Sequence, residues 1–135
     1  MSTKKVIGQT KSAGFQFGLR KTFSISPESA WDVLFAPRGI DIWLGELPEA
    51  LELKKSFVTK NGISGLVRVF KPNSHIRLNW KRPDWENTST LQIRIIPNGD
   101  KTTISFHQEK LLDANQRLEM KKHWNAVLDQ LTAIL

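Results

Sequence analysis

The fold of this chain is decided by residues 20–31, which read RKTFSISPESAW. The first half belongs to a run in which apolar and polar side chains alternate, and a period of two predicts a β-strand with one buried face. Ser26 is a residue type that caps helices, Pro27 suits the first helical position, and Glu28 places a favourable negative charge in the first turn. The stretch therefore predicts a strand over residues 15–25 that leads directly into a helix.

Two irregularities flank this unit. Lys21 interrupts the apolar set of the strand, and we expect a bend or bulge near it that lets the charge turn outward. Pro37-Arg38-Gly39 is expected to end the first helix, and residues 40–44 predict a second short helix that ends before Gly45.

The middle of the chain reads as strands separated by turn chemistry, including Asn61-Gly62, a strong hairpin signal. Strands are expected at residues 51–59, 63–71, 75–82, 88–96 and 101–110. Short turns between them predict an antiparallel meander. From Asp113, a helix cap, apolar residues recur at spacings of three and four, which predicts one long amphipathic helix to cover the sheet.

Alternation within the strands predicts which side chains share each face of the sheet. The inner, apolar face is expected to hold Val67, Val69, Ile76, Leu78, Trp80, Leu91, Ile93, Ile95, Ile104 and Phe106. The outer face is expected to hold Arg68, Phe70, Arg77, Asn79, Lys81, Gln92, Arg94, Thr103, Ser105 and His107.

The order of strand, two short helices, meander and long terminal helix resembles the α+β helix-grip fold, a curved sheet wrapped around a C-terminal helix. The residues that carry this resemblance are 20–31, Trp43, 77–80, Phe106-His107, and His123-Trp124 with Leu128. Over about residues 15–135 the chain resembles the START-like (SRPBCC) superfamily, in the branch similar to the C-terminal domain of the activator of Hsp90 ATPase. The resemblance implies binding of lipids, sterols, polyketides or hormones, an enzymatic activity in some members, or contact with a chaperone.

The leading hypothesis is a non-catalytic domain that holds a hydrophobic or amphipathic small molecule between the sheet and the terminal helix, where pockets are apolar with few polar groups. His123 or Arg77 would anchor a polar end of the ligand. The expected cavity wall is Trp43, Val67, Val69, Leu78, Trp80, Ile93, Ile95, Phe106, Met120, His123 and Trp124. The competing interpretation is that these side chains fill the core completely.

A second hypothesis is a protein-interaction module of the Hsp90-activator kind. The chain carries a formal charge of +7, which favours anionic partners. The expected interaction face is Arg68, Arg77, Lys81 and Arg94, and its partner an acidic protein. A nucleic acid is not expected, since single-strand binding usually adds stacking aromatics to such a face.

Catalysis is expected to be absent, because no nucleophile–base signature, phosphate-binding loop or dinucleotide fingerprint occurs. A lyase or cyclase working inside the cavity is the weaker alternative and would need a buried titratable group. His75, His107 and His123 are expected in structural or surface roles, and no metal or cofactor is expected.

Composition limits the setting of the protein. The chain has 135 residues, 39% of them apolar and 24% charged, and no cysteine. These values predict one globular domain, and the lack of cysteine favours a reducing cytoplasm as its location. Residues 1–14 are rich in Lys, Ser, Thr and Gly without periodicity, so they are expected to form a flexible arm before a domain over residues 15–135. No stretch is long enough to span a membrane, and the first residues lack the apolar run of a secretory signal.

Overall fold

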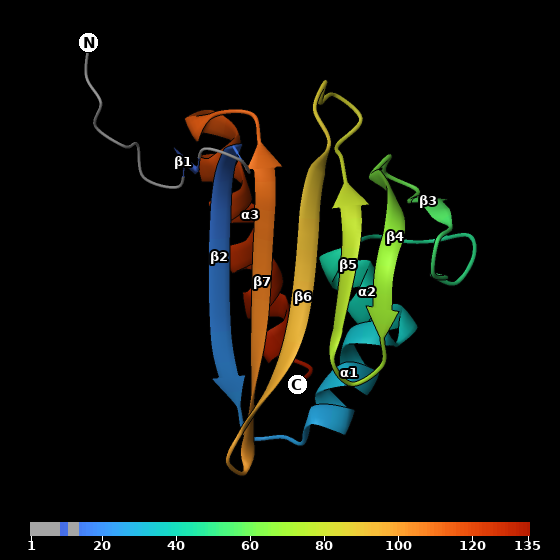
Figure 1. Cartoon of the computed structure of the whole chain (residues 1–135). Helices are drawn as coiled ribbons and strands as arrows, with labels where there is room; N and C mark the ends of the chain where they lie inside the picture. The colour runs from blue at the N-terminus through green and yellow to red at the C-terminus, as the bar shows by residue number, and fades with distance from the viewer. Residues whose placement is uncertain (1–8, 11–13) are drawn as a thin grey trace.

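One antiparallel sheet forms the front layer of the molecule in Figure 1, with strand order β1-β2-β7-β6-β5-β4-β3. The computed structural model describes residues 9–10 and 14–135. The strands are β1 (Gln9–Thr10), β2 (Gly14–Phe23), β3 (Ser56–Val58), β4 (Ser64–Lys71), β5 (His75–Trp80), β6 (Ser89–Asn98) and β7 (Lys101–Leu111). Strands β3 to β7 pair in chain order, so the predicted meander is confirmed. The strand expected at 51–59 is reduced to the three residues of β3.

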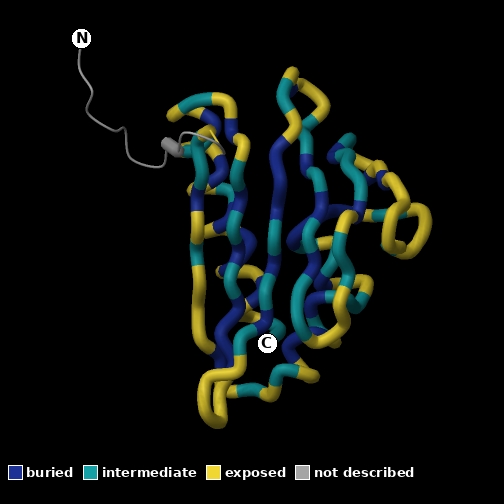
Figure 2. Tube along the Cα trace, in the orientation of Figure 1, coloured by how far each residue is buried: buried dark blue, intermediate teal, exposed yellow. Residues whose placement is uncertain are grey.

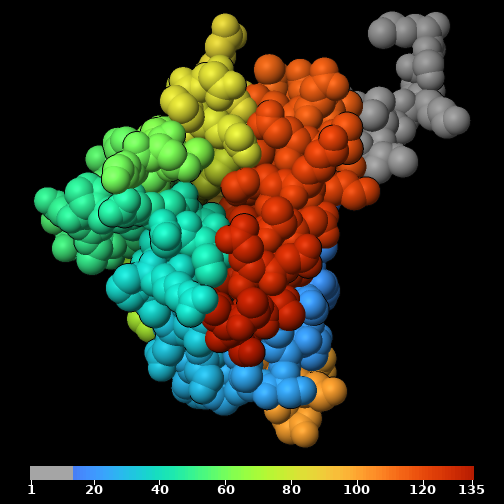
Figure 3. Space-filling view, turned by 180° about the vertical axis from the view of Figure 1, so that it is seen from behind, coloured from blue at the N-terminus to red at the C-terminus, as the bar shows by residue number. Residues whose placement is uncertain are grey.

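Three helices lie on one face of the sheet and leave the other face open (Figures 1 and 3). They are α1 (Pro27–Phe35), α2 (Pro37–Trp43) and α3 (Ala114–Thr132). The side chains of Ser26 and Asp113 accept hydrogen bonds from backbone N–H groups of the first helical turns, as their residue types predict. The α+β helix-grip fold is thereby confirmed.

The second helix begins earlier than expected. Pro37 occupies its first turn, where the missing N–H group removes no hydrogen bond. This proline therefore starts α2 as well as ending α1. Gly39 then packs against the end of α1: an added Cβ would lie 1.9 Å from the Val33 carbonyl oxygen. The two helices therefore touch through backbone at this glycine.

Two face assignments are corrected by the register of β4. Val67 pairs with Leu78, but Val69 pairs with Arg77, so Arg68 is an extra, bulged residue. Beyond the bulge the faces exchange: Val69 lies on the outer face beside Arg77, and Phe70 turns inward, 5.9 Å from the Trp31 ring. The assignments of Val69 to the inner face and Phe70 to the outer face were therefore wrong.

The expected bulge near Lys21 is also absent. Residues 17–23 pair with β7 without interruption, and the irregularity of this pair lies between Phe15 and Phe17. Lys21 stays on the helix side, where its exposed side chain donates to Thr132 Oγ1 at 3.1 Å, near the end of α3. A long lysine can reach the edge of the core and keep its charge in water.

The sequence before β2 is only partly described. Of the arm expected at residues 1–14, Gln9 and Thr10 pair with Phe15 and Gly14, and most of the remainder lies outside the described residues. No helix in the described part of the chain is long and apolar enough to cross a membrane.

Candidate functional site

Most of the residues expected to wall a cavity are buried between the sheet and the helices. Figure 2 shows buried segments along the central strands. Nine of the expected wall residues are at most 4% exposed: Trp43, Val67, Leu78, Trp80, Ile93, Ile95, Phe106, Met120 and Trp124. The Trp124 ring stacks on Phe106 at 5.3 Å and lies 6.0 Å from Trp80. His123 lies at the margin and Val69 on the opposite face. That the inner residues enclose a ligand stays a prediction.

A chain of hydrogen bonds crosses this interior. Trp124 Nε1 donates to Gln108 Oε1 at 2.7 Å, and Gln108 Nε2 donates to Ser89 Oγ at 2.8 Å. Ser89 Oγ in turn donates to the Trp80 carbonyl oxygen at 2.6 Å. Because each of the polar atoms in this series of hydrogen bonds has a partner, the polar strip is compatible with a dry core.

His123 on α3 is held neutral by its surroundings. Burial, and to a smaller extent the nearby Arg82 guanidinium, together lower its pKa to about 4. Arg82 Nη2 lies 3.4 Å from His123 Nδ1, and a guanidinium only donates, so the imidazole proton belongs on Nε2. Glu119 balances the arginine, with its carboxylate 3.3 Å from Arg82 Nε.

Two ring nitrogens beside this pair are buried without a hydrogen-bond partner, Trp80 Nε1 and His123 Nε2. The two rings are 5.7 Å apart. Both nitrogens are donors in the tautomer described above, and a buried donor without a partner is unusual in proteins. The interior therefore has unused capacity for an acceptor oxygen at this place.

The open face of the sheet carries a row of basic side chains. In the register of the sheet, Lys71, His75, Arg94, Ser105 and Arg20 lie directly opposite one another on β4, β5, β6, β7 and β2. We call these five residues the basic row. Adjacent strands are separated by about 4.8 Å, so the row extends over about 19 Å.

The electrostatics of the basic row agree with its geometry. The pKa of His75 is lowered, first by partial burial and then by the positive charges of Arg94 and Lys71. Strands β2 and β4 to β7 together contain eight lysines and arginines and a single carboxylate, Glu109. That carboxylate is already used, because it lies 3.0 Å from Arg77 Nη2. The row itself contains no acid.

The expected interaction face differs in part from this row. Arg94 belongs to the basic row, whereas Arg77 is paired with Glu109, Arg68 projects from the bulge, and Lys81 lies beyond β5 in an isolated bridge to Ser64. Sequence reasoning missed Arg20 and Lys71. Alternation could not place either residue in one row with Arg94, because that requires the register of five strands.

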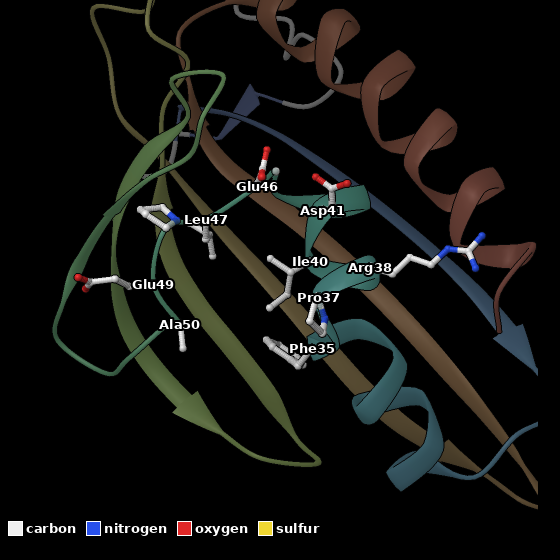
Figure 4. A pocket seen from close by; sticks show the side chains of 11 residues that line it. Phe35, Pro37, Arg38, Ile40, Asp41, Glu46, Leu47, Glu49 and Ala50 are labelled. Atoms are coloured by element: carbon white, nitrogen blue, oxygen red, sulfur yellow. The ribbon is translucent and has the colours of Figure 1, made fainter.

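A groove opens on the helix side, between α2 and the segment that follows it (Figure 4). Its volume is about 810 Å³. Its lining is Phe35, Pro37, Arg38, Ile40, Asp41, Gly45, Glu46, Leu47, Pro48, Glu49 and Ala50. None of these residues was predicted as a site, because the groove is shaped by the path of residues 44–50, which carry no periodic signal.

Over residues 9–10 and 14–135, no three His, Asp or Glu side chains gather where they could hold an ion. His75 and His107 lie on the outer face, where His107 Nε2 is 3.0 Å from Gln16 Oε1.

Comparison with known proteins places this architecture. Residues 24–135 match the family described as activator of Hsp90 ATPase homolog 1-like protein. The chain belongs to this family. No curated protein sequence matches the chain.

Solved structures agree with the family assignment. CalU16 from Micromonospora echinospora superposes with a TM-score of 0.79 at 19% identity, covering 90% of this chain and 78% of that one. PFC0360w, an HSP90 activator from Plasmodium falciparum, superposes with a TM-score of 0.74 at 19% identity, covering 90% of this chain and 96% of that one. The Aha1 dimer from Colwellia psychrerythraea superposes with a TM-score of 0.71 at 15% identity, covering 86% of this chain and 92% of that one. At these identities the structural likeness establishes the fold.

Proposed function

We propose that this chain is a non-catalytic interaction domain of the cytoplasm that docks an acidic surface of Hsp90 onto the open face of its sheet. The observation that carries the proposal is the basic row, in which four of the five side chains are basic, the fifth is Ser105, and none is acidic. Membership of the Hsp90-activator family supplies the class of partner.

The position of the basic row supports docking. All three helices cover the opposite face, so a flat partner surface can approach the row without displacing an element (Figure 1). Arg20 and Lys71 are exposed at the two ends of the row, and Arg94 is half-buried at its centre. Complementary charge of this kind raises the association rate and selects partners more than it adds affinity.

The test is ATP hydrolysis by the Hsp90 of the same genome, with and without an excess of this chain. We expect stimulation at about 0.05 M salt that falls several-fold at about 0.3 M, because exposed charges are screened. The double reversal R20E/R94E should abolish the stimulation. The matched control K121E/K122E changes the charge equally on exposed positions of α3 and should retain it.

Two results would contradict this proposal. Absence of any stimulation by the unmodified chain at low salt would remove Hsp90 as the partner. Equal loss in both double variants would show that net charge matters and the basic row does not. Circular dichroism of each variant establishes that it is folded.

A second candidate function is binding of a hydrophobic or amphipathic molecule between sheet and α3, and one observation favours it. Trp80 Nε1 and His123 Nε2 are buried donors without partners, and acceptor oxygens of a ligand would satisfy them. His123, not Arg77, is then the polar anchor, since Arg77 lies on the outer face in a pair with Glu109.

Native mass spectrometry distinguishes this second candidate. A small molecule that is retained on the purified chain and lost after organic extraction would support it. The replacement His123→Leu should then lower the retained fraction. A bare mass in samples purified at neutral pH, together with no mass shift on adding fatty acids or sterols, would speak for a filled core.

A further inference from the structure

The groove between α2 and residues 44–50 combines an apolar centre with acidic ends. Phe35, Ile40 and Leu47 are only partly buried, and in Figure 4 their side chains occupy the middle of the groove with Pro37. The Phe35 ring is fixed from behind, because it stacks on Trp31 at 4.2 Å and meets the Trp43 ring edge-on at 5.8 Å. The floor of the groove is therefore rigid and apolar.

Backbone hydrogen bonds hold the far wall in place. Gly45 N donates to the Ile40 carbonyl oxygen and Lys60 N donates to the Glu46 carbonyl oxygen, both at 2.9 Å. Gly45 has a φ of +130°, and an added Cβ would lie 3.0 Å from Asn61 Oδ1. The chain thus turns sharply after α2, and the turn sets the width of the groove.

The charge of this region is opposite to that of the whole chain. Residues 38–52 contain four carboxylates and one base, Arg38, whereas the chain carries +7. Three of these carboxylates line the groove: Asp41, Glu46 and Glu49. Arg38 extends away from the apolar centre toward α3, and Asp41 and Glu46 stand together at one end (Figure 4).

Few charges among the described residues neutralise Asp41 and Glu46, whereas the charge of Glu49 acts on Lys55. Within the described part of the chain, Asp41 and Glu49 form no ion pair, and Glu46 has only Lys60, at 3.6 Å between two largely exposed side chains. An exposed pair of this kind contributes little and exchanges readily for another cation. The acidic end of the groove therefore favours a positively charged group.

From these features we infer that the groove is a binding site for a cationic amphiphile, a small molecule with an apolar body and an amine or quaternary ammonium group. The apolar body lies on Phe35, Ile40 and Leu47, and the cation lies against Asp41 and Glu46. The volume of about 810 Å³ falls within the range of small-molecule pockets, roughly 300–1,000 Å³. The site is separate from the basic row, which is on the other face of the sheet.

Three probes of equal chain length test the charge preference: decyltrimethylammonium, decyl maltoside and decyl sulfate, each below its micelle concentration. Titrations followed by amide NMR should show the cationic probe binding about tenfold more tightly than the neutral one, with shifted signals over residues 35–50. Because the chain is positive overall, general electrostatics favour the sulfate. A preference for the cation therefore requires a local acidic site, and the positions of the shifted signals show whether that site is the groove.

Two variants locate the preference. D41N/E46Q should lower the affinity for the cationic probe to that for the neutral probe. The control E28Q/D32N removes two exposed charges from α1 and should leave the affinity for the cationic probe unchanged. Leu47→Ser should weaken the cationic and neutral probes alike. Tighter binding of decyl sulfate to residues 35–50, no binding of the cationic probe there, or indifference to D41N/E46Q would each overturn the inference. None of these outcomes depends on Hsp90, so this site and the basic row fail or succeed separately.

Discussion

Single residues in this protein decide how a polar strip is accommodated in an aromatic core. Gln108 connects Trp124 to Ser89 within a layer that is otherwise apolar, and His123 is held uncharged at its margin by burial and by Arg82. Both residues affect stability through buried polar groups: the Gln108 amide would be costly to leave without partners, and the His123 ring would be costly to ionise.

The charge state of His123 predicts a dependence of stability on pH. Its pKa is about 4 in the folded protein and about 6.5 in the unfolded chain, so the unfolded state binds the proton first as the pH falls. The stability associated with the neutral ring is therefore complete above pH 6.5 and is lost toward pH 4. Allowing for partial exposure of the ring, we expect a loss of about 2 kcal/mol.

Urea denaturation at pH 7.5 and pH 4.5 measures this term. The difference in unfolding free energy between the two pH values should be smaller in His123→Gln than in the unmodified protein, because the variant lacks the His123 contribution. It should not fall to zero, because other groups, including His75 with its lowered pKa, titrate in both proteins. Equal differences would show that His123 is not the group responsible.

Gln108→Leu should destabilise the protein by about 1–3 kcal/mol, because the buried Trp124 N–H loses its acceptor. In the background Trp124→Phe, where that donor is absent, the same replacement should cost much less. A double-mutant cycle in thermal or urea denaturation isolates the coupling, and additive effects would contradict it.

At the scale of elements, the junction of α1 and α2 shapes both the core and the groove. Gly39 allows α2 to start at once after α1 and to pack against its last turn, so that Phe35 and Trp43 meet in space. Any side chain at this position must move a helix backbone.

Gly39→Ala is therefore expected to lower stability by about 1–3 kcal/mol or more, since the new Cβ would lie 1.9 Å from the Val33 carbonyl oxygen. Gly18→Ala is the matched control, because its Cβ would meet no atom closer than 3.8 Å. Urea denaturation of both variants checks this, and a tolerant Gly39→Ala would mean that α2 shifts freely.

The sequence predicted most elements but not how some of them pair. The caps at Ser26 and Asp113 and the alternation in β5 to β7 are local signals, and they placed the helices and the inner face correctly. The bulge at Arg68 is not local, because it depends on the partner strand, and Val69 and Phe70 were misassigned for that reason. The basic row and the groove require register and loop path, which no single segment encodes.

The whole molecule is electrostatically two-sided. The open face of the sheet concentrates cations, and the α2 groove concentrates carboxylates, within a chain of formal charge +7. Net charge alone therefore describes its interactions poorly.

Cation-exchange chromatography should reveal this asymmetry. R20E/R94E and K121E/K122E both bring the formal charge from +7 to +3. The first variant should nevertheless elute at lower salt, because it disrupts the basic row and the second does not. Identical elution would mean that retention on the resin depends on net charge only.

The bulge in β4 has a consequence for how this sequence can change in length. Arg68 is the residue without a cross-strand partner, and the faces on either side of it are already set, with Val67 inward, Val69 outward and Phe70 inward. Removing Arg68 would join Val67 to Val69 and restore strict alternation while every neighbour keeps its partner and its face. The deletion of this one residue is therefore expected to shorten the chain without repacking the interior.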